Sequence, residues 1–242
     1  MSTREHGHFS SDSIAAGAKP VVRRRAAREL LGALAIMALA PAVCSALSTE
    51  NAELQAALRA TPRLDRGAED FDTCAACHGR DGGGASDGTI PAIAGQHESV
   101  LVRQLIEFRH NARLNIRMQH FVDRHHLTDA QQLADVAAYV SSLPPRSVAS
   151  GGAVAPPGSA ATYARRCRSC HGGSGEGDAA MHVPRLAGQH PEYLGEQLHD
   201  AAEGRRPSMR GHTRLLAKLS TEEIDGLAVY LANLGPTRGA AA

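Results

Sequence analysis

The sequence contains no tryptophan and few other aromatic residues. Its 242 residues include only four Phe and four Tyr, which is little aromatic surface for the cores that a chain of this length can build. A large apolar cofactor would supply part of the missing buried surface. No segment alternates as a strand does. There is also no Ser-His-Asp set, phosphate-binding loop or pair of carboxylates, so nothing in the sequence indicates a catalytic acid, base or nucleophile.

The first 46 residues have the pattern of an export signal. Four arginines within residues 23–28 precede an uncharged apolar run over residues 30–43, and Cys44-Ser45-Ala46 follow. This order is typical of a secretory signal peptide. An uncleaved membrane anchor is the alternative, but the run is short for a membrane span. We predict cleavage after Ala46 and no membrane span in the mature chain, with peripheral association left open.

Residues 1–46 hold more basic than acidic residues, so their removal leaves a slightly acidic chain. This charge balance argues against nucleic acid as a partner. Removal also takes away Cys44, one of the five cysteines.

The other four cysteines form two pairs, each followed by a histidine, within a long internal repeat. The pairs lie in CAACHG (74–79) and CRSCHG (167–172). IPAIAGQH (90–97) matches VPRLAGQH (183–190), and LTDAQQLADVAAYVSSL (127–143) matches LSTEEIDGLAVYLANL (219–234). The same elements follow in the same order, so the chain carries an internal duplication.

The two copies predict two small all-α domains in tandem. One amphipathic helix should follow each AGQH stretch, and another should end each copy. Thr128 and Ser220 are the expected N-caps of the terminal helices. A Pro-, Gly-, Ser- and Ala-rich segment between the copies reads as a linker. We therefore place the first domain at 47–143, the linker at 144–161 and the second domain at 162–242.

The Cys-x-x-Cys-His pattern is the attachment pattern of haem c. Its two thiols bind the haem vinyl groups, and the adjacent histidine is the proximal iron ligand. A zinc site with all four cysteines as ligands is the first alternative, but it leaves His78 and His171 unexplained. A redox disulfide needs a βαβ context, which this helical pattern lacks. Two such motifs on an exported chain favour two covalently attached haem c groups.

Two prolines recur at one position of the repeat. The backbone carbonyls of Pro91 and Pro184 could accept a hydrogen bond from the second ring nitrogen of each proximal histidine. Such a bond fixes the ring and raises its basicity. An ordinary loop turn is the alternative, but the recurrence favours a role at the haem.

With these motifs the chain resembles the dihaem class I cytochromes c of the cytochrome c4 family, over roughly residues 65–235. The resemblance implies periplasmic electron transfer between two class I domains. It also implies thioether bonds at Cys74, Cys77, Cys167 and Cys170, proximal ligands His78 and His171, and a role beside the haems for Pro91 and Pro184.

The chain departs from this family on the distal side of the haems, where the family has a methionine before the last helix. Met118 and Met209 are equivalent when the copies are aligned back from their terminal helices without gaps. His120 and His212 are equally spaced from Leu127 and Leu219, and His212 is nearer the family's ligand position. We expect Met118 and Met209 to be the distal ligands, with His120 and His212 as alternatives.

The favoured function is a periplasmic carrier that passes electrons between respiratory partners such as a terminal oxidase, a reductase or a dehydrogenase, without being an enzyme itself. A dihaem subunit of a periplasmic sulfide or alcohol dehydrogenase is the alternative, since its haem domains would look the same. A thiosulfate-oxidising dihaem enzyme is a third reading. It would need a replaceable iron ligand.

Overall fold

The computed structural model describes residues 49–145 and 152–234. The predicted signal peptide, residues 1–46, lies outside the described residues, as does 146–151 of the predicted linker. The described part has no strand, only an isolated bridge between Asp178 and Val183, and the expected all-α class is confirmed. Over the same ranges, no helix has the length and apolar character needed to cross a membrane.

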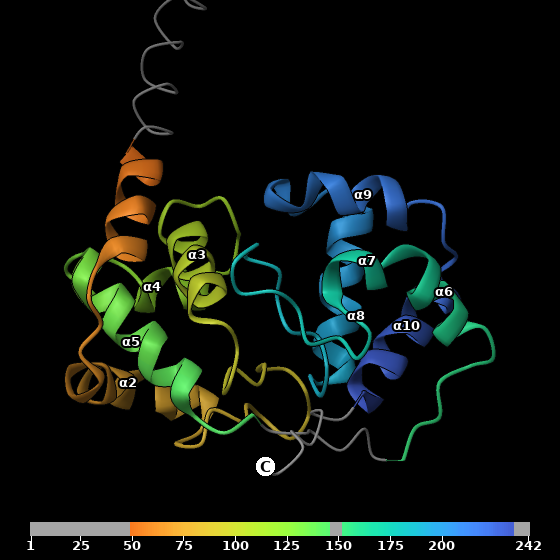
Figure 1. The fold of residues 1–242 in the computed structure, drawn as a ribbon, viewed down its shortest axis with the longest axis horizontal. Helices are drawn as coiled ribbons and strands as arrows, with labels where there is room; N and C mark the ends of the chain where they lie inside the picture. The colour runs from red at the N-terminus through yellow and green to blue at the C-terminus, as the bar shows by residue number, and fades with distance from the viewer. Residues whose placement is uncertain (1–48, 146–151, 235–242) are drawn as a thin grey trace, which may run out of the picture. The chain divides into compact units, whose positions relative to one another are not determined.

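The helices from α2 to α5 recur in the same order in the second half, where α6 and α7 together take the place of α2 (Figure 1). The helix at residues 49–59 has no counterpart among the described residues of the second half. Residues 49–59 are helical and precede α2 (Leu64–His78), α3 (Glu98–Arg109), α4 (Ile116–Phe121) and α5 (Ala130–Ser142). The second half has α6 (Ser159–Arg166), α7 (Arg168–His171), α8 (Pro191–Ala202), a 3-10 turn at Pro207–Met209, α9 (Arg210–Leu216) and α10 (Thr221–Asn233). Helix α6 thus begins inside the last residues of the predicted linker.

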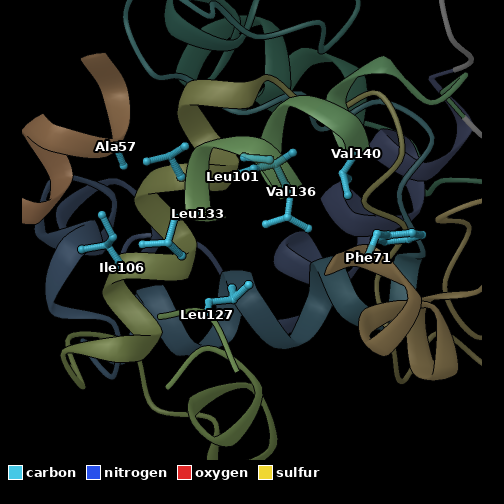
Figure 2. Packing of buried hydrophobic residues seen from close by; sticks show 10 residues of the cluster. Ala57, Phe71, Leu101, Ile106, Leu127, Leu133, Val136 and Val140 are labelled. Atoms are coloured by element: carbon cyan, nitrogen blue, oxygen red, sulfur yellow. The ribbon is translucent and has the colours of Figure 1, made fainter. Parts of the chain in front are cut away.

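Each half has its own apolar core beneath the terminal helix. In the first half the helix at 49–59, α2, α3 and α5 contribute to the core (Figure 2), which contains Ala57, Phe71, Leu101, Val102, Ile106, Leu127, Leu133, Val136, Ala137 and Val140. The smaller second core contains Tyr163, Leu194, Leu227, Ala228, Leu231 and Ala232. These cores are mostly aliphatic, as the low aromatic content requires.

In each half, an aromatic pair joins the helix that leads to the Cys-x-x-Cys-His motif to the terminal helix. Phe71 of α2 lies 5.5 Å from Tyr139 of α5, and Tyr163 of α6 lies 5.5 Å from Tyr230 of α10, both as tilted rings. Tilted pairs at such distances are favourable. Half of the eight Phe and Tyr residues are therefore used where the helix that leads to the Cys-x-x-Cys-His motif crosses the terminal helix.

The caps of the two terminal helices differ. Ser220 caps α10 as expected, and with Glu223 it forms a complete capping box. The expectation at Thr128 is wrong: Asp129 is the N-cap of α5, because its carboxylate accepts from the Gln132 N–H. The Gln132 side chain instead accepts from the hydroxyl and backbone N–H of Thr128.

A glycine lets the backbones approach closely at each helix crossing. A Cβ added to Gly67 of α2 would lie 2.0 Å from the Asp135 carbonyl oxygen of α5. The crossing in the second half has its glycine on the other helix, where a Cβ on Gly226 of α10 would lie 2.8 Å from Ser159 Oγ. Because the atoms close to Gly67 are backbone, glycine is needed at the first crossing, whereas a Cβ at Gly226 would require the Ser159 hydroxyl to move.

Replacing Gly67 with alanine should therefore destabilise the first domain, although alanine favours helix by about 1 kcal/mol. We expect a net loss of about 1–3 kcal/mol in the free energy of unfolding, because the methyl group forces the crossing apart. Gly195→Ala in α8 is the matched control. Its Cβ would make only an ordinary contact at 3.9 Å, so it should stabilise by up to about 1 kcal/mol. Urea unfolding measures both, and equal effects would contradict the close crossing.

Candidate functional site

The first Cys-x-x-Cys-His motif forms the last turn of α2. Cys74 is half-buried against the first core, Cys77 is exposed and His78 is buried, with 7% of its surface accessible. Gly79 follows with a φ of 78°, a conformation that favours glycine, and ends the helix. The helical spacing thus places Cys74 and His78 one turn apart.

The second motif has the same burial pattern on a broken helix. Cys167 lies between α6 and α7, half-buried against the second core, while Cys170 is exposed. His171 ends α7 and is as buried as His78. Neither cysteine pair forms a disulfide in the described part of the chain.

Each motif histidine is held by the carbonyl of the proline at the equivalent repeat position. His78 Nδ1 lies 3.0 Å from the Pro91 oxygen, and His171 Nδ1 lies 3.1 Å from the Pro184 oxygen. A carbonyl only accepts, so Nδ1 must carry the proton. The lone pair of each ring is then on Nε2, which is the nitrogen that can bind a metal ion.

A glycine packs closely against each of these proline carbonyls and donates its N–H to the carbonyl of the motif histidine. Gly84 donates its N–H to the His78 carbonyl, and Gly177 does so to that of His171. Both glycines have positive φ, of 77° and 74°, and an added Cβ would lie within 2.7 Å of the Pro91 or the Pro184 carbonyl group. A side chain there would push the proline carbonyl away from the ring.

Burial keeps the imidazoles neutral and the inner thiols protonated. It lowers the pKa of His78, although the bond to Pro91 raises it. The pKa of His171 is lowered by burial and also by the nearby His212, against the bond to Pro184. Burial raises the pKa of Cys74 to about 11 and raises that of Cys167. Neutral imidazoles suit iron ligation, and S–H groups suit addition to vinyl double bonds.

In the first half, Met118 and His120 both belong to α4 but lie in different surroundings. Met118 is half-buried in α4, and its N–H donates to the side chain of Asn115, the helix N-cap. His120 is exposed, with 63% of its side chain accessible, and its ring packs edge-on against Phe121 and His126.

Asp123 organises the turn after α4. Its carboxylate accepts from the ring of His126 and from two backbone N–H groups, and these bonds lower its pKa to about 2. Ligand atoms of His120, Asp123 and His126 all lie within 4.8 Å of one another. His120 thus belongs to an exposed polar cluster.

The second distal loop has a different arrangement. Met209 ends the 3-10 turn and is half-buried. The ring of His212, in α9, lies 6.0 Å from the ring of His171, and burial followed by the nearby Arg206 lowers its pKa. The structure therefore brings His212, the expected alternative, beside the motif histidine.

Two half-buried arginines were missed by the sequence reasoning. The Nε groups of Arg185 and Arg206 are buried and have no hydrogen-bond partner among the described residues. Unpaired guanidinium N–H groups are costly unless an anion joins them, and the propionate carboxylates of haem are such anions. The only sequence signal was that the first copy has Ala92 where the second has Arg185.

Comparison with known proteins agrees with this geometry. The profile of the cytochrome c family matches residues 64–144 and again 157–235. Cytochrome c4 of Azotobacter vinelandii is 33% identical over 183 residues, which cover 66% of this chain and 84% of that protein. A thiosulfate dehydrogenase electron acceptor of Stutzerimonas stutzeri is 35% identical over 176 residues, covering 67% of this chain and 79% of that protein.

Among solved structures, reduced recombinant cytochrome c4 from Pseudomonas stutzeri has a TM-score of 0.60 at 30% identity. The match covers 71% of this chain and 98% of that one. Two tandem matches to one family and 98% coverage of a cytochrome c4 structure confirm the resemblance stated from the motifs. The chain belongs to the cytochrome c family, as a dihaem, cytochrome c4-like member whose family implies covalently bound haem c and electron transport.

Proposed function

We propose that this protein is a periplasmic dihaem carrier that passes electrons between respiratory redox proteins. The observation that carries the proposal is the duplicated Cys-x-x-Cys-His motif in which each histidine is held through Nδ1 by a proline carbonyl. Cys74 and Cys77 would bind one haem and Cys167 and Cys170 the other. Each thiol would form a carbon–sulfur bond to a vinyl group, and its hydrogen would go to the other vinyl carbon.

Haem iron would supply the one-electron chemistry, and residues of this chain would set its reduction potential. The proline carbonyls orient His78 and His171 and raise the basicity of their Nε2 atoms, which stabilises ferric iron. Burial excludes water from both rings. The unpaired Nε groups of Arg185 and Arg206 would receive carboxylates of the porphyrin.

We further propose that the two sites have different distal ligands. Met118 suits the first site, because it is half-buried while His120 is held in an exposed cluster. The gap-free alignment favours Met209 at the second site, but the ring contact supports His212. The ring of His212 lies 6.0 Å from the ring of His171, so His212 would be within reach of a metal ion held by His171.

A second candidate function is electron acceptor for one dehydrogenase. It is favoured by the similarity to the protein described as a thiosulfate dehydrogenase electron acceptor. Purification from the native host separates the two functions. A carrier should be recovered alone and be reduced by several partners, whereas a dedicated acceptor should co-purify with its dehydrogenase.

Haem attachment can be tested by mass. The exported protein should begin near Leu47 and carry two haems, seen in its intact mass and its pyridine haemochrome spectrum. The double variant Cys74→Ala/Cys77→Ala should lose one haem and keep the other, because each domain has its own thiols. Cys44→Ala is the control and should change nothing, since Cys44 lies in the predicted signal. Bound zinc, or a mature mass without haem, would contradict the proposal.

The role of the Pro91 carbonyl can be tested through its supporting glycine. Gly84→Ala should displace the carbonyl, weaken the bond to His78 and raise the reduction potential of the first haem, measured by spectroelectrochemical titration. Gly204→Ala is the control, since the φ of Gly204, 74°, is close to the 77° of Gly84 but nothing lies within 4 Å of an added Cβ. It should cost about 1 kcal/mol in unfolding free energy and leave both potentials unchanged. An unchanged first potential in Gly84→Ala would argue against the carbonyl's role.

The distal ligands can be identified from the weak red band of methionine-ligated ferric haem. Met118→Ala should abolish this band. Met209→Ala should leave both haem spectra intact, whereas His212→Ala should convert the second haem to high spin. An imidazole in place of a thioether lowers the potential, so the second haem should titrate below the first. If Met209→Ala changes the second haem and His212→Ala does not, Met209 is the ligand.

A further inference from the structure

The loops that hold the two proximal histidines are also bonded to each other. Gln189 Oε1 accepts from the Ala92 N–H at 2.9 Å, and its Nε2 donates to the Ala92 carbonyl at 2.7 Å. Gln96 makes the same two bonds, at 2.9 Å each, with the N–H and carbonyl of Arg185. Each glutamine belongs to the AGQH stretch of its own copy and binds the backbone of the other copy.

The histidines next in sequence add a second pair of reciprocal bonds. His97 Nε2 lies 2.9 Å from the Glu176 carbonyl, and His190 Nε2 lies 2.9 Å from the Gly83 carbonyl. Glu176 and Gly83 are equivalent in the repeat. These glutamine and histidine bonds are thus symmetric, each made once in each direction. Other bonds across the contact, such as that from Arg113 to Tyr193, have no mirror partner.

The glutamines bind a particular peptide group. In the peptide group between Pro91 and Ala92, the carbonyl accepts from His78 Nδ1 and the N–H donates to Gln189 Oε1. The equivalent peptide, between Pro184 and Arg185, lies between His171 and Gln96. A peptide group is conjugated, and hydrogen bonds in a chain polarise one another. Donation by the N–H makes the same peptide's oxygen a better acceptor.

We propose that Gln96 and Gln189 are positioning residues that tune the axial histidine of the opposite domain. Gln189, in the second copy, strengthens the Pro91 carbonyl as an acceptor for His78, and Gln96 does the same for His171. A stronger Nδ1–H bond raises the basicity of the ring and stabilises ferric iron. Each glutamine therefore lowers the reduction potential of the haem in the other domain. This inference rests on the proposed function, in which both histidines bind haem iron.

The alternative is that the glutamines only hold the two domains together. Replacement of either one would then act on both haems alike, through a looser contact. The His190–Gly83 bond offers a matched control, because it crosses the same contact without touching the Pro91–Ala92 peptide. Gln189→Met removes both bonds to Ala92 at similar size, and His190→Phe removes the bond to Gly83.

The test is NMR of the reduced, diamagnetic haem protein with 15N-labelled histidine, together with potentials of each haem from its methyl resonances. In Gln189→Met the Nδ1 proton of His78 should move upfield and the potential of the first haem should rise, with His171 and the second haem unchanged. Gln96→Met should give the mirror result. Gln189→Glu, which keeps an oxygen acceptor for the Ala92 N–H, should retain the wild-type His78 signal. His190→Phe should move neither axial proton.

An unmoved His78 proton in Gln189→Met, or equal shifts at both histidines, would overturn the inference. If Gln189→Met cannot be purified folded, Gln96→Met decides in the same way from the His171 proton. Failure of the proposed function gives a different result, because a chain without covalent haem is detected from the pyridine haemochrome spectrum before any variant is compared.

Discussion

The hydrogen bond from a buried histidine to a proline carbonyl is the contact on which both candidate sites depend. It fixes the proton on Nδ1 and so leaves Nε2 as the nitrogen that can bind a metal ion. The surrounding backbone is arranged around this carbonyl, with a glycine of positive φ packed beneath it in each half. The adjacent N–H then reaches the other half of the chain. The helix that carries each motif places its cysteine side chains, whereas the loop that contains the proline orients the histidine ring.

Much of the fold and part of the site could be predicted from the sequence, because those features are local or repeated. Cys74 and His78 belong to one short motif, and the recurrence of Pro91 at the same position as Pro184 indicated its importance. The all-α class followed from helical periodicity and the absence of strand patterns. Ser220 could be predicted as a helix N-cap because its capping-box partner, Glu223, is only three residues away.

The features that could not be predicted depend on contacts between distant segments. Gly67 and Gly226 lie on different helices of their copies, so no repeat position marks either helix crossing. Asp129 replaces Thr128 as the cap because the Gln132 side chain binds Thr128 instead. The distal loops differ in length and composition between the copies. Only the folded structure shows that His120 is exposed, whereas His212 lies beside His171.

The reciprocal glutamine contact has a consequence for how the two-domain chain arose. The glutamine and histidine bonds are each made once in each direction between equivalent residues, as in the isologous interface of a two-fold symmetric dimer, although other bonds across the contact, such as that from Arg113 to Tyr193, have no mirror partner. Two separate copies of a single ancestral domain would make the same bonds as a homodimer before any linker joined them. Gene fusion then needs no new interface, only a connection between two chains that already recognise each other. After fusion the copies can diverge in their distal loops, but a change to either AGQH stretch alters the backbone contacts of its twin.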